Sequence, residues 1–355
     1  MDGINFHSVR NAPFVLDGIL NPLPGEFRRV PVDVATATNP GVVGNSLCPA
    51  GVRARFSTDA SKLVLKAELK ASHSHHFPCS GENGFDLYKV GADGREHRVG
   101  TMIYGATRDP ETCEGISVTL PSGKMATYVL YFPNYSSVQE VYVGLPEEAK
   151  LEAPVNHYIY TDPVVYYGSS ITQGGCASRA ALSYEAIISR MLRTQFINLG
   201  FSGSAKGEDA IVDYMASIPN MSAFVLDYDH NAPTPEHLAK THGMIYHKIR
   251  AKHPELPIIF VTRPDAPVLS DNINRRREVV MRTYLYARSS GDKNVYYVDG
   301  ITMMMGDTNG ETTVDTCHPN DLGFRQMAYA IGGTLDPILR QQYRKKLAKE
   351  ESTNG

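Results

Sequence analysis

Five short, almost wholly apolar segments recur through the second half of the chain. They are residues 164–167, 196–199, 223–227, 257–262 and 295–298. Parallel strands buried on both faces have this character, whereas a strand with one wet face alternates apolar and polar residues. Stretches of helical character lie between them, so the order predicts an α/β fold: a doubly wound, three-layer α/β/α parallel sheet.

Helix signals support this order. Residues 183–194 have the composition of a helix after the first apolar segment. Thr234, Pro235 and Glu236 supply a capping hydroxyl, a first-turn proline and an early acid, which together predict a helix start.

The first half, from about residue 6 to residue 153, has a different pattern. Leu63, Leu65 and Leu69 fall on one face of an alternating strand, and turn signals recur between such segments. The predicted strands are residues 51–56, 62–69, 85–90, 97–104, 116–120, 127–132 and 138–143. This spacing predicts an all-β, jelly-roll-like sandwich. A charged, proline-bearing stretch at 145–150 places the boundary between a domain of residues 1–155 and a domain of residues 156–355.

Charge and hydropathy exclude several classes of partner. The 355 residues include 35 basic and 38 acidic residues, and the net charge is −3. This balance predicts neither nucleic acid nor an anionic membrane as a partner, and no apolar run approaches the roughly 18 residues that span a bilayer. Residues 1–7 do not resemble a signal peptide. We therefore expect either a cytoplasmic protein or the mature form of a secreted or periplasmic one.

The cysteines and histidines give no familiar metal motif. The five cysteines form no C-x-x-C pair, which argues against a disulfide framework or a structural zinc site. His73 and His75 would share a strand face near Cys79, but a fourth ligand at a familiar spacing is missing, so a polar loop near the substrate is favoured. Cys176 and Cys317 lie near the candidate site residues described below, either as a disulfide or as two free thiols.

A candidate nucleophile follows the first apolar segment. Ser170 stands where a strand ends and a helix begins, where backbone N–H groups can meet a developing negative charge. The turn is not a G-x-S-x-G elbow, because Thr172 replaces its second glycine. Asp315 lies three residues before His318, and this pair can supply the base and its orienting acid from one loop.

Two further blocks complete a pattern. Gly203 and Asn231 follow the second and third apolar segments, so all the candidate residues fall at the carboxyl edge of the sheet, where ligands bind. In this order the sequence resembles the SGNH (GDSL) hydrolase superfamily, whose fold is flavodoxin-like. The resemblance implies Ser170 as nucleophile, His318 as base and Asp315 as its orienter. It also implies an oxyanion hole from the Ser170 and Gly203 amides and the Asn231 side chain.

The sequence departs from the family pattern at one position and contains a second family motif. Ser169 stands where the family has the aspartate of Gly-Asp-Ser, which changes local hydrogen bonding and not the triad. Residues 84–88, Gly-Phe-Asp-Leu-Tyr, resemble the GxDLY motif of a domain that precedes certain SGNH hydrolases. Together the two resemblances cover most of the chain. The chain is thus similar to two-domain members of the superfamily, which include bacterial carbohydrate acetyl-esterases and a few acyltransferases.

The resemblance implies a serine esterase that hydrolyses a short-chain ester, acetyl above all, on a small-molecule or oligosaccharide substrate without metal or cofactor. An acyltransferase with the same triad, a long-chain lipase and a non-catalytic carbohydrate-binding protein are the alternatives. Arg263, Arg179 and His230 follow strand ends and are candidate substrate-binding residues, each with a salt bridge or loop hydrogen bond as the competing role.

Overall fold

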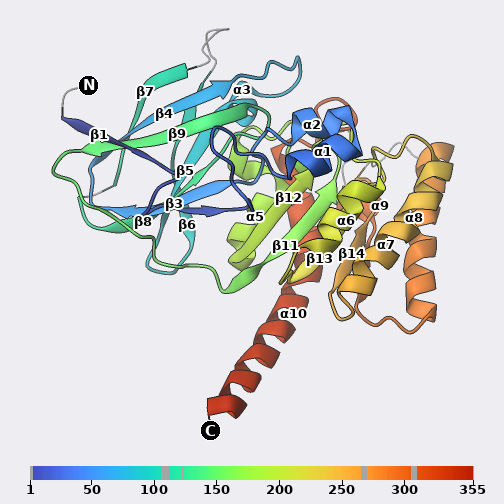
Figure 1. Cartoon of the computed structure of the whole chain (residues 1–355). Coiled ribbons are helices and arrows are strands. Elements are labelled where there is room, and N and C mark those ends of the chain that lie inside the picture. The colour runs from blue at the N-terminus through green and yellow to red at the C-terminus, as the bar shows by residue number, and fades with distance from the viewer. Residues whose placement is uncertain (1–2, 105–111, 122, 265–269, 305–309, 355) are drawn as a thin grey trace.

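The computed structural model describes residues 3–104, 112–121, 123–264, 270–304 and 310–354. An antiparallel β-sandwich from the first half of the chain packs beside an α/β body from the second half (Figure 1). Both predicted architectures are confirmed.

The sandwich consists of two antiparallel sheets. One contains, in order, β1 (Ile4–Ser8), β9 (Ser137–Pro146), β4 (Lys62–Lys70) and β7 (Thr112–Thr119). The other contains β10 (Leu151–Glu152), β3 (Arg53–Thr58), β8 (Ala126–Tyr131), β5 (Gly84–Val90) and β6 (Glu96–Ile103), with β2 (Val15–Asp17) beside β3. The inward apolar side chains of both sheets form one core. All seven predicted strands are present, while β1, β2 and β10 are additional.

The α/β body contains a five-stranded parallel sheet. Its order is β12 (Thr194–Gly200), β11 (Tyr160–Gly168), β13 (Ala223–Asp227), β14 (Ile258–Val261) and β15 (Val295–Val298). Val164 and Tyr166 of β11 face one apolar core, and Val165 and Tyr167 face another. The strands are apolar throughout because both faces are covered.

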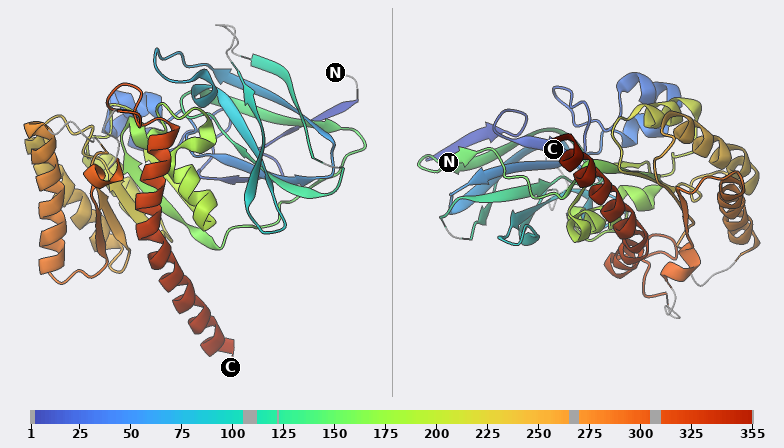
Figure 2. Two further views of the ribbon diagram at one scale, coloured as in Figure 1. Left: turned by 180° about the vertical axis from the view of Figure 1, so that it is seen from behind. Right: turned by 90° about the horizontal axis from the view of Figure 1, so that it is seen from below.

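Helices form the outer layers. On one face lie α5 (Tyr184–Leu192) and α10 (Asp321–Asn354). On the other lie α6 (Asp209–Ser217), α7 (Pro235–Lys252) and α8 (Asp271–Ser289). The Thr234 hydroxyl accepts a hydrogen bond from the His237 amide, so the predicted cap of α7 is present. The last turns of α10 extend away from the body (Figure 2). None of the helices in the described residues has the length and apolar character of a membrane span.

Two of the short helices that were not predicted pack against the α/β body. They are α1 (Val32–Thr38) and α2 (Pro40–Asn45), which belong to the first half of the chain but bury Ala35 and Val42 in a core of the α/β body. The sequence did carry a signal for α2, because Asn39 caps it and Pro40 begins it.

The motif aspartate joins the two halves of the molecule. Asp86 is fully buried, and its Oδ2 accepts hydrogen bonds from Arg179 Nη1 at 3.0 Å and from the Ala181 amide at 3.1 Å. Thr101 donates to Oδ1. The carboxylate of the sandwich therefore fixes the segment that follows the Ser170 turn.

This contact gives a stability prediction. Asp86→Ala should lower the free energy of unfolding by about 2–4 kcal/mol, because a buried charged acceptor with three donors is lost. Denaturant unfolding would measure the change. Asp93→Ala is the matched control, since Asp93 is exposed on the same domain, and it should change stability little. A loss of stability in Asp86→Ala no larger than that in Asp93→Ala would contradict this role of the Asp86 carboxylate.

Candidate active site

The candidate nucleophile lies at the start of a one-turn helix. β11 ends at Gly168, and α4 (Ser170–Gln173) begins at once. Ser169 caps α4 through a hydrogen bond that its side chain accepts from the Ile171 amide. The serine that replaces the family aspartate therefore stabilises the turn locally. The Ser170 amide lies among the first N–H groups of a helix, which lack intrahelical partners.

The three predicted triad side chains lie together. Ser170 Oγ is 2.8 Å from His318 Nε2, and His318 Nδ1 is 2.7 Å from Asp315 Oδ2. The other carboxylate oxygen of Asp315 accepts hydrogen bonds from the His318 amide at 2.7 Å and the Cys317 amide at 3.1 Å. Asp315 and His318 therefore contact each other within one loop, and the His318 imidazole contacts the hydroxyl of Ser170, 148 residues away in the chain.

The charge of the acid is stabilised by its partners. Partial burial acts to raise the pKa of Asp315, but hydrogen bonds from the His318 amide and imidazole and the amide of Cys317 outweigh it. The pKa of Asp315 therefore lies below its ordinary value, and the carboxylate can orient and stabilise a charged imidazolium.

The predicted oxyanion donors follow neighbouring strands. The loop after β12 is fixed by hydrogen bonds from the Phe201 amide to Gly168 O, 2.9 Å, and from the Ser202 amide to Gln173 Oε1, 2.9 Å. Gly203 in this loop is exposed and has a φ of 63°, which favours glycine. Asn231 Nδ2 donates to Phe201 O at 2.8 Å, which leaves its second N–H for another acceptor.

A buried arginine from the first half of the chain supports this loop. Arg29 donates to Cys48 O at 2.7 Å and to Asn198 O at 2.9 Å. Burial lowers the pKa of Arg29 to about 10, so it stays charged at neutral pH. Asn45 in α2 adds a hydrogen bond from Nδ2 to Ser202 O at 3.0 Å. These residues could not be predicted from the sequence, because only the fold brings them near the site.

Side chains of the sandwich domain also reach the triad. His76 Nε2 is 3.5 Å from Asp315 Oδ2. The ring of Phe77 lies with its centroid 5.4 Å from that of His318, and Tyr135 donates from its hydroxyl to Ser170 O at 3.1 Å. The predicted polar loop at residues 73–76 is therefore a loop beside the site, whereas the contact of His76 with Asp315 was not predicted.

The three candidate substrate-binding residues differ in their surroundings. Arg179 is directed to Asp86, which is the competing salt-bridge role. The Arg263 amide donates to Asp229 Oδ2 at 3.1 Å, and His230 Nδ1 is 4.0 Å from Cys317 Sγ. Substrate contact by any of the three stays a prediction.

The two nearby cysteines are free thiols. Of the two alternatives left by the sequence, the structure thus shows the unbonded pair. Cys176 is buried, its Sγ lies 3.6 Å from His76 O, and burial together with the charge of Asp315 raises its pKa to about 12.

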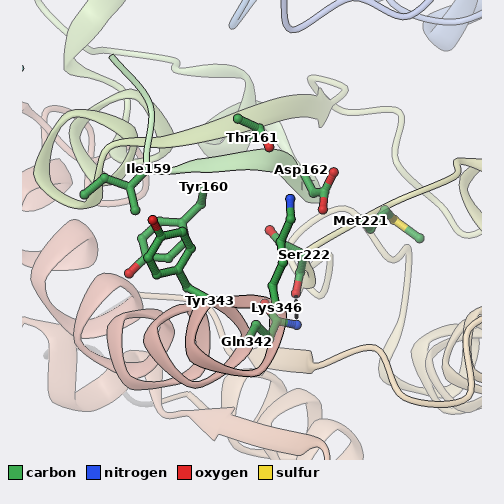
Figure 3. A pocket seen from close by; sticks show the side chains of 9 residues that line it. All are labelled: Ile159, Tyr160, Thr161, Asp162, Met221, Ser222, Gln342, Tyr343 and Lys346. Carbon is green, nitrogen blue, oxygen red and sulfur yellow. Dashed lines mark hydrogen bonds between the residues drawn. The ribbon is translucent and has the colours of Figure 1, made fainter. Parts of the chain in front are cut away.

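The pocket drawn in Figure 3 lies away from the candidate triad. Its volume is about 250 Å³, and its lining includes Tyr160, Ser222 and Tyr343. Tyr160 begins β11, whereas Ser170 follows the end of that strand, roughly 25 Å away at about 3.3 Å per residue. This pocket therefore cannot hold a substrate at Ser170.

A buried acid lies behind the nucleophile turn. Asp227 ends β13, and its Oδ2 accepts hydrogen bonds from Thr172 Oγ1 and Tyr184 Oη, both at 3.1 Å. Complete burial, with the nearby charge of Asp229, raises the pKa of Asp227 from 3.8 to about 7.

Family comparisons agree with the geometry. Residues 161–336 match the model of the GDSL-like lipase/acylhydrolase family, and residues 4–151 match the model of the GxDLY domain, the N-terminus of SGNH-hydrolase-type esterases. The chain belongs to the SGNH (GDSL) hydrolases of the two-domain type.

Solved structures share the whole fold. A protein described as a GDSL-like lipase from Bacteroides ovatus is 26% identical, with a TM-score of 0.83 over 95% of this chain and 98% of that one. The salicylyl-acyltransferase SsfX3 from a tetracycline biosynthetic pathway is 20% identical, with a TM-score of 0.76 over 93% and 96%. A family two carbohydrate esterase from Clostridium thermocellum is 16% identical, with a TM-score of 0.61 over 83% and 94%. A comparison with curated protein sequences found no match.

The buried acid behind the turn gives a prediction on pH. Between about pH 4 and about pH 7, folded Asp227 keeps a proton that the unfolded chain loses, so the free energy of unfolding falls as the pH rises through this window, by up to about 1.4 kcal/mol per pH unit. Asp227→Asn keeps the shape of the side chain but removes the ionisable group. Its stability relative to wild type should therefore rise with pH by more than about 2 kcal/mol across that window.

Denaturant unfolding at several pH values would measure this difference. Asp213→Asn, at an exposed position of α6, should keep the wild-type pH dependence. Equal slopes for Asp227→Asn and wild type would show that Asp227 is ionised in the folded protein.

Proposed function

We propose that this protein is a serine esterase that hydrolyses short-chain esters, acetyl esters above all, on a carbohydrate. One observation carries the proposal: Ser170 Oγ lies 2.8 Å from His318 Nε2 while His318 Nδ1 lies 2.7 Å from Asp315 Oδ2. Hydrolase family membership agrees with it.

The chemistry follows from this chain of contacts. Ser170 Oγ attacks the ester carbonyl as His318 Nε2 takes its proton, and Asp315 stabilises the imidazolium. His318 then gives that proton to the leaving alcohol, and an acyl-enzyme remains on Ser170. A water molecule repeats the sequence, which releases the carboxylic acid and restores the serine.

The oxyanion would form near three donors. These are the amides of Ser170 and Gly203 and the second N–H of Asn231, each placed after a neighbouring strand of the same sheet edge. Preorganised donors stabilise the tetrahedral intermediate because they need not reorient as charge develops.

The acyl group and acceptor are the finer part of the proposal. Crowding by Phe77 and His76 around the triad supports a small acyl group. The carbohydrate acceptor is suggested by the family resemblance and by the shared fold of the family two carbohydrate esterases. A screen of acetylated oligosaccharides for acetate release, with p-nitrophenyl esters of increasing chain length beside it, tests both parts. Preference for long acyl chains would contradict the first, and the absence of release from every sugar ester would contradict the second.

An acyltransferase is the second candidate. The same triad serves both reactions, and SsfX3 shares the fold over nearly the whole chain. Product analysis with and without alcohol acceptors separates the two. Free acid as the main product supports the hydrolase, whereas a new ester formed at the expense of free acid supports the transferase.

Ser170→Ala should lower turnover by several powers of ten, since removal of a triad nucleophile leaves only binding and oxyanion stabilisation. The rate of acetate release from p-nitrophenyl acetate would measure the loss. Ser217→Ala, at the end of α6, is the control and should keep the wild-type rate. A Ser170→Ala rate near that of wild type would assign the nucleophile elsewhere.

Asn231→Ala should lower turnover by about 10²–10³-fold with a smaller change in KM, because the lost donor acts on the intermediate. Steady-state kinetics would measure both constants. Asn274→Ala on the surface of α8 is the control. An unchanged kcat would place the oxyanion hole elsewhere.

A further inference from the structure

We propose that the active site is also a binding site for a zinc-class divalent ion, held by His76, Cys176 and His318, and that this ion switches the enzyme off. One ligand atom from each of these residues lies within 4.8 Å of the other two. The regulatory part rests on the proposed function, whereas the binding part does not.

The donor set selects the kind of ion. One thiolate and two imidazoles suit zinc and its borderline-soft relatives, whereas magnesium and calcium prefer oxygen. Three protein ligands leave one tetrahedral position for water. The Asp315 carboxylate, 3.5 Å from His76 Nε2 and 2.7 Å from His318 Nδ1, adds a negative charge beside the ion.

The ligand atoms need only a small movement. Zinc–nitrogen and zinc–sulfur bond lengths place tetrahedral ligand atoms about 3.3–3.6 Å apart, so separations of up to 4.8 Å must shorten by up to about 1.2–1.5 Å. His76 can supply this movement, because it lies in a segment without helix or strand and its side chain is 41% exposed. The exposed imidazole of His76 can meet the ion in solvent, whereas Cys176 is buried.

Binding must interrupt the proposed reaction. His318 has two ring nitrogens, and each already serves the triad. A bond from Nε2 to the ion removes the acceptor of the Ser170 proton, and a bond from Nδ1 separates the imidazole from Asp315. Either geometry stops general base catalysis.

Proton balance is simple. When the ion binds, Cys176 Sγ gives its proton to solvent and forms the sulfur–metal bond, with no change of oxidation state.

The site is tested first by direct binding. Cobalt(II), added to the full chain, should give the near-ultraviolet charge-transfer band of a thiolate–cobalt bond in wild type and in Cys79→Ala, a control at another free cysteine. The band should vanish in Cys176→Ala. A missing band in wild type, or a band retained by Cys176→Ala, would overturn the site.

Activity tests the switch. Zinc chloride should lower p-nitrophenyl acetate hydrolysis by about ten-fold or more, reversed by a chelator, while magnesium chloride has no effect. Each variant is normalised to its own metal-free rate. The zinc concentration that gives half-inhibition should rise by about ten-fold or more in Cys176→Ala and His76→Gln, because loss of a direct ligand weakens metal affinity at least as much as loss of an outer hydrogen-bond partner. His76→Gln keeps the test open if Cys176→Ala fails to fold. Unchanged midpoints in both variants would overturn the proposal.

The two proposals fail in different ways. A wild-type rate in Ser170→Ala would remove the proposed function, yet the cobalt band would still support the site. Loss of the band with an intact Ser170 dependence would remove the metal site alone.

Discussion

Burial of the parallel sheet on both faces is the constraint on which the rest of the molecule depends. It requires helices on each side, and the parallel direction of the strands brings the carboxyl ends of β11, β12 and β13 to one edge. Because β11 lies between the other two, Ser170 emerges between the loops that carry Gly203 and Asn231. The site is thus a consequence of strand order, and the last loop only has to deliver His318 to a position the sheet has already fixed.

The parts of this arrangement that depend on periodicity and local chemistry could be predicted from sequence. Apolar runs identified all five parallel strands, and the spacing of Asp315 and His318 identified a pair that one turn holds together. Ser169 was expected to change the local hydrogen bonding of the turn, and its side chain caps α4. These features are local, so few competing interactions can override them.

Contacts between distant segments could not be predicted. His76 has no local pattern that points to Asp315, 239 residues later in the chain. Arg29 likewise resembles any other arginine until the fold surrounds it with the carbonyls of Cys48 and Asn198. Such residues gain their role from tertiary packing, which neither hydrophobic period nor turn chemistry encodes.

The shared core at the domain junction has a consequence for dissecting the protein. Tyr88, Val129 and Tyr131 of the sandwich belong to the same apolar cluster as Ile187 and Ile188 of α5. A truncated fragment beginning near residue 156 would expose this surface to water and lose Arg29, which supports the loop after β12. Chimeras that exchange the sandwich between relatives must therefore carry over both sides of this apolar cluster, because the two halves share it and should melt as a single cooperative unit.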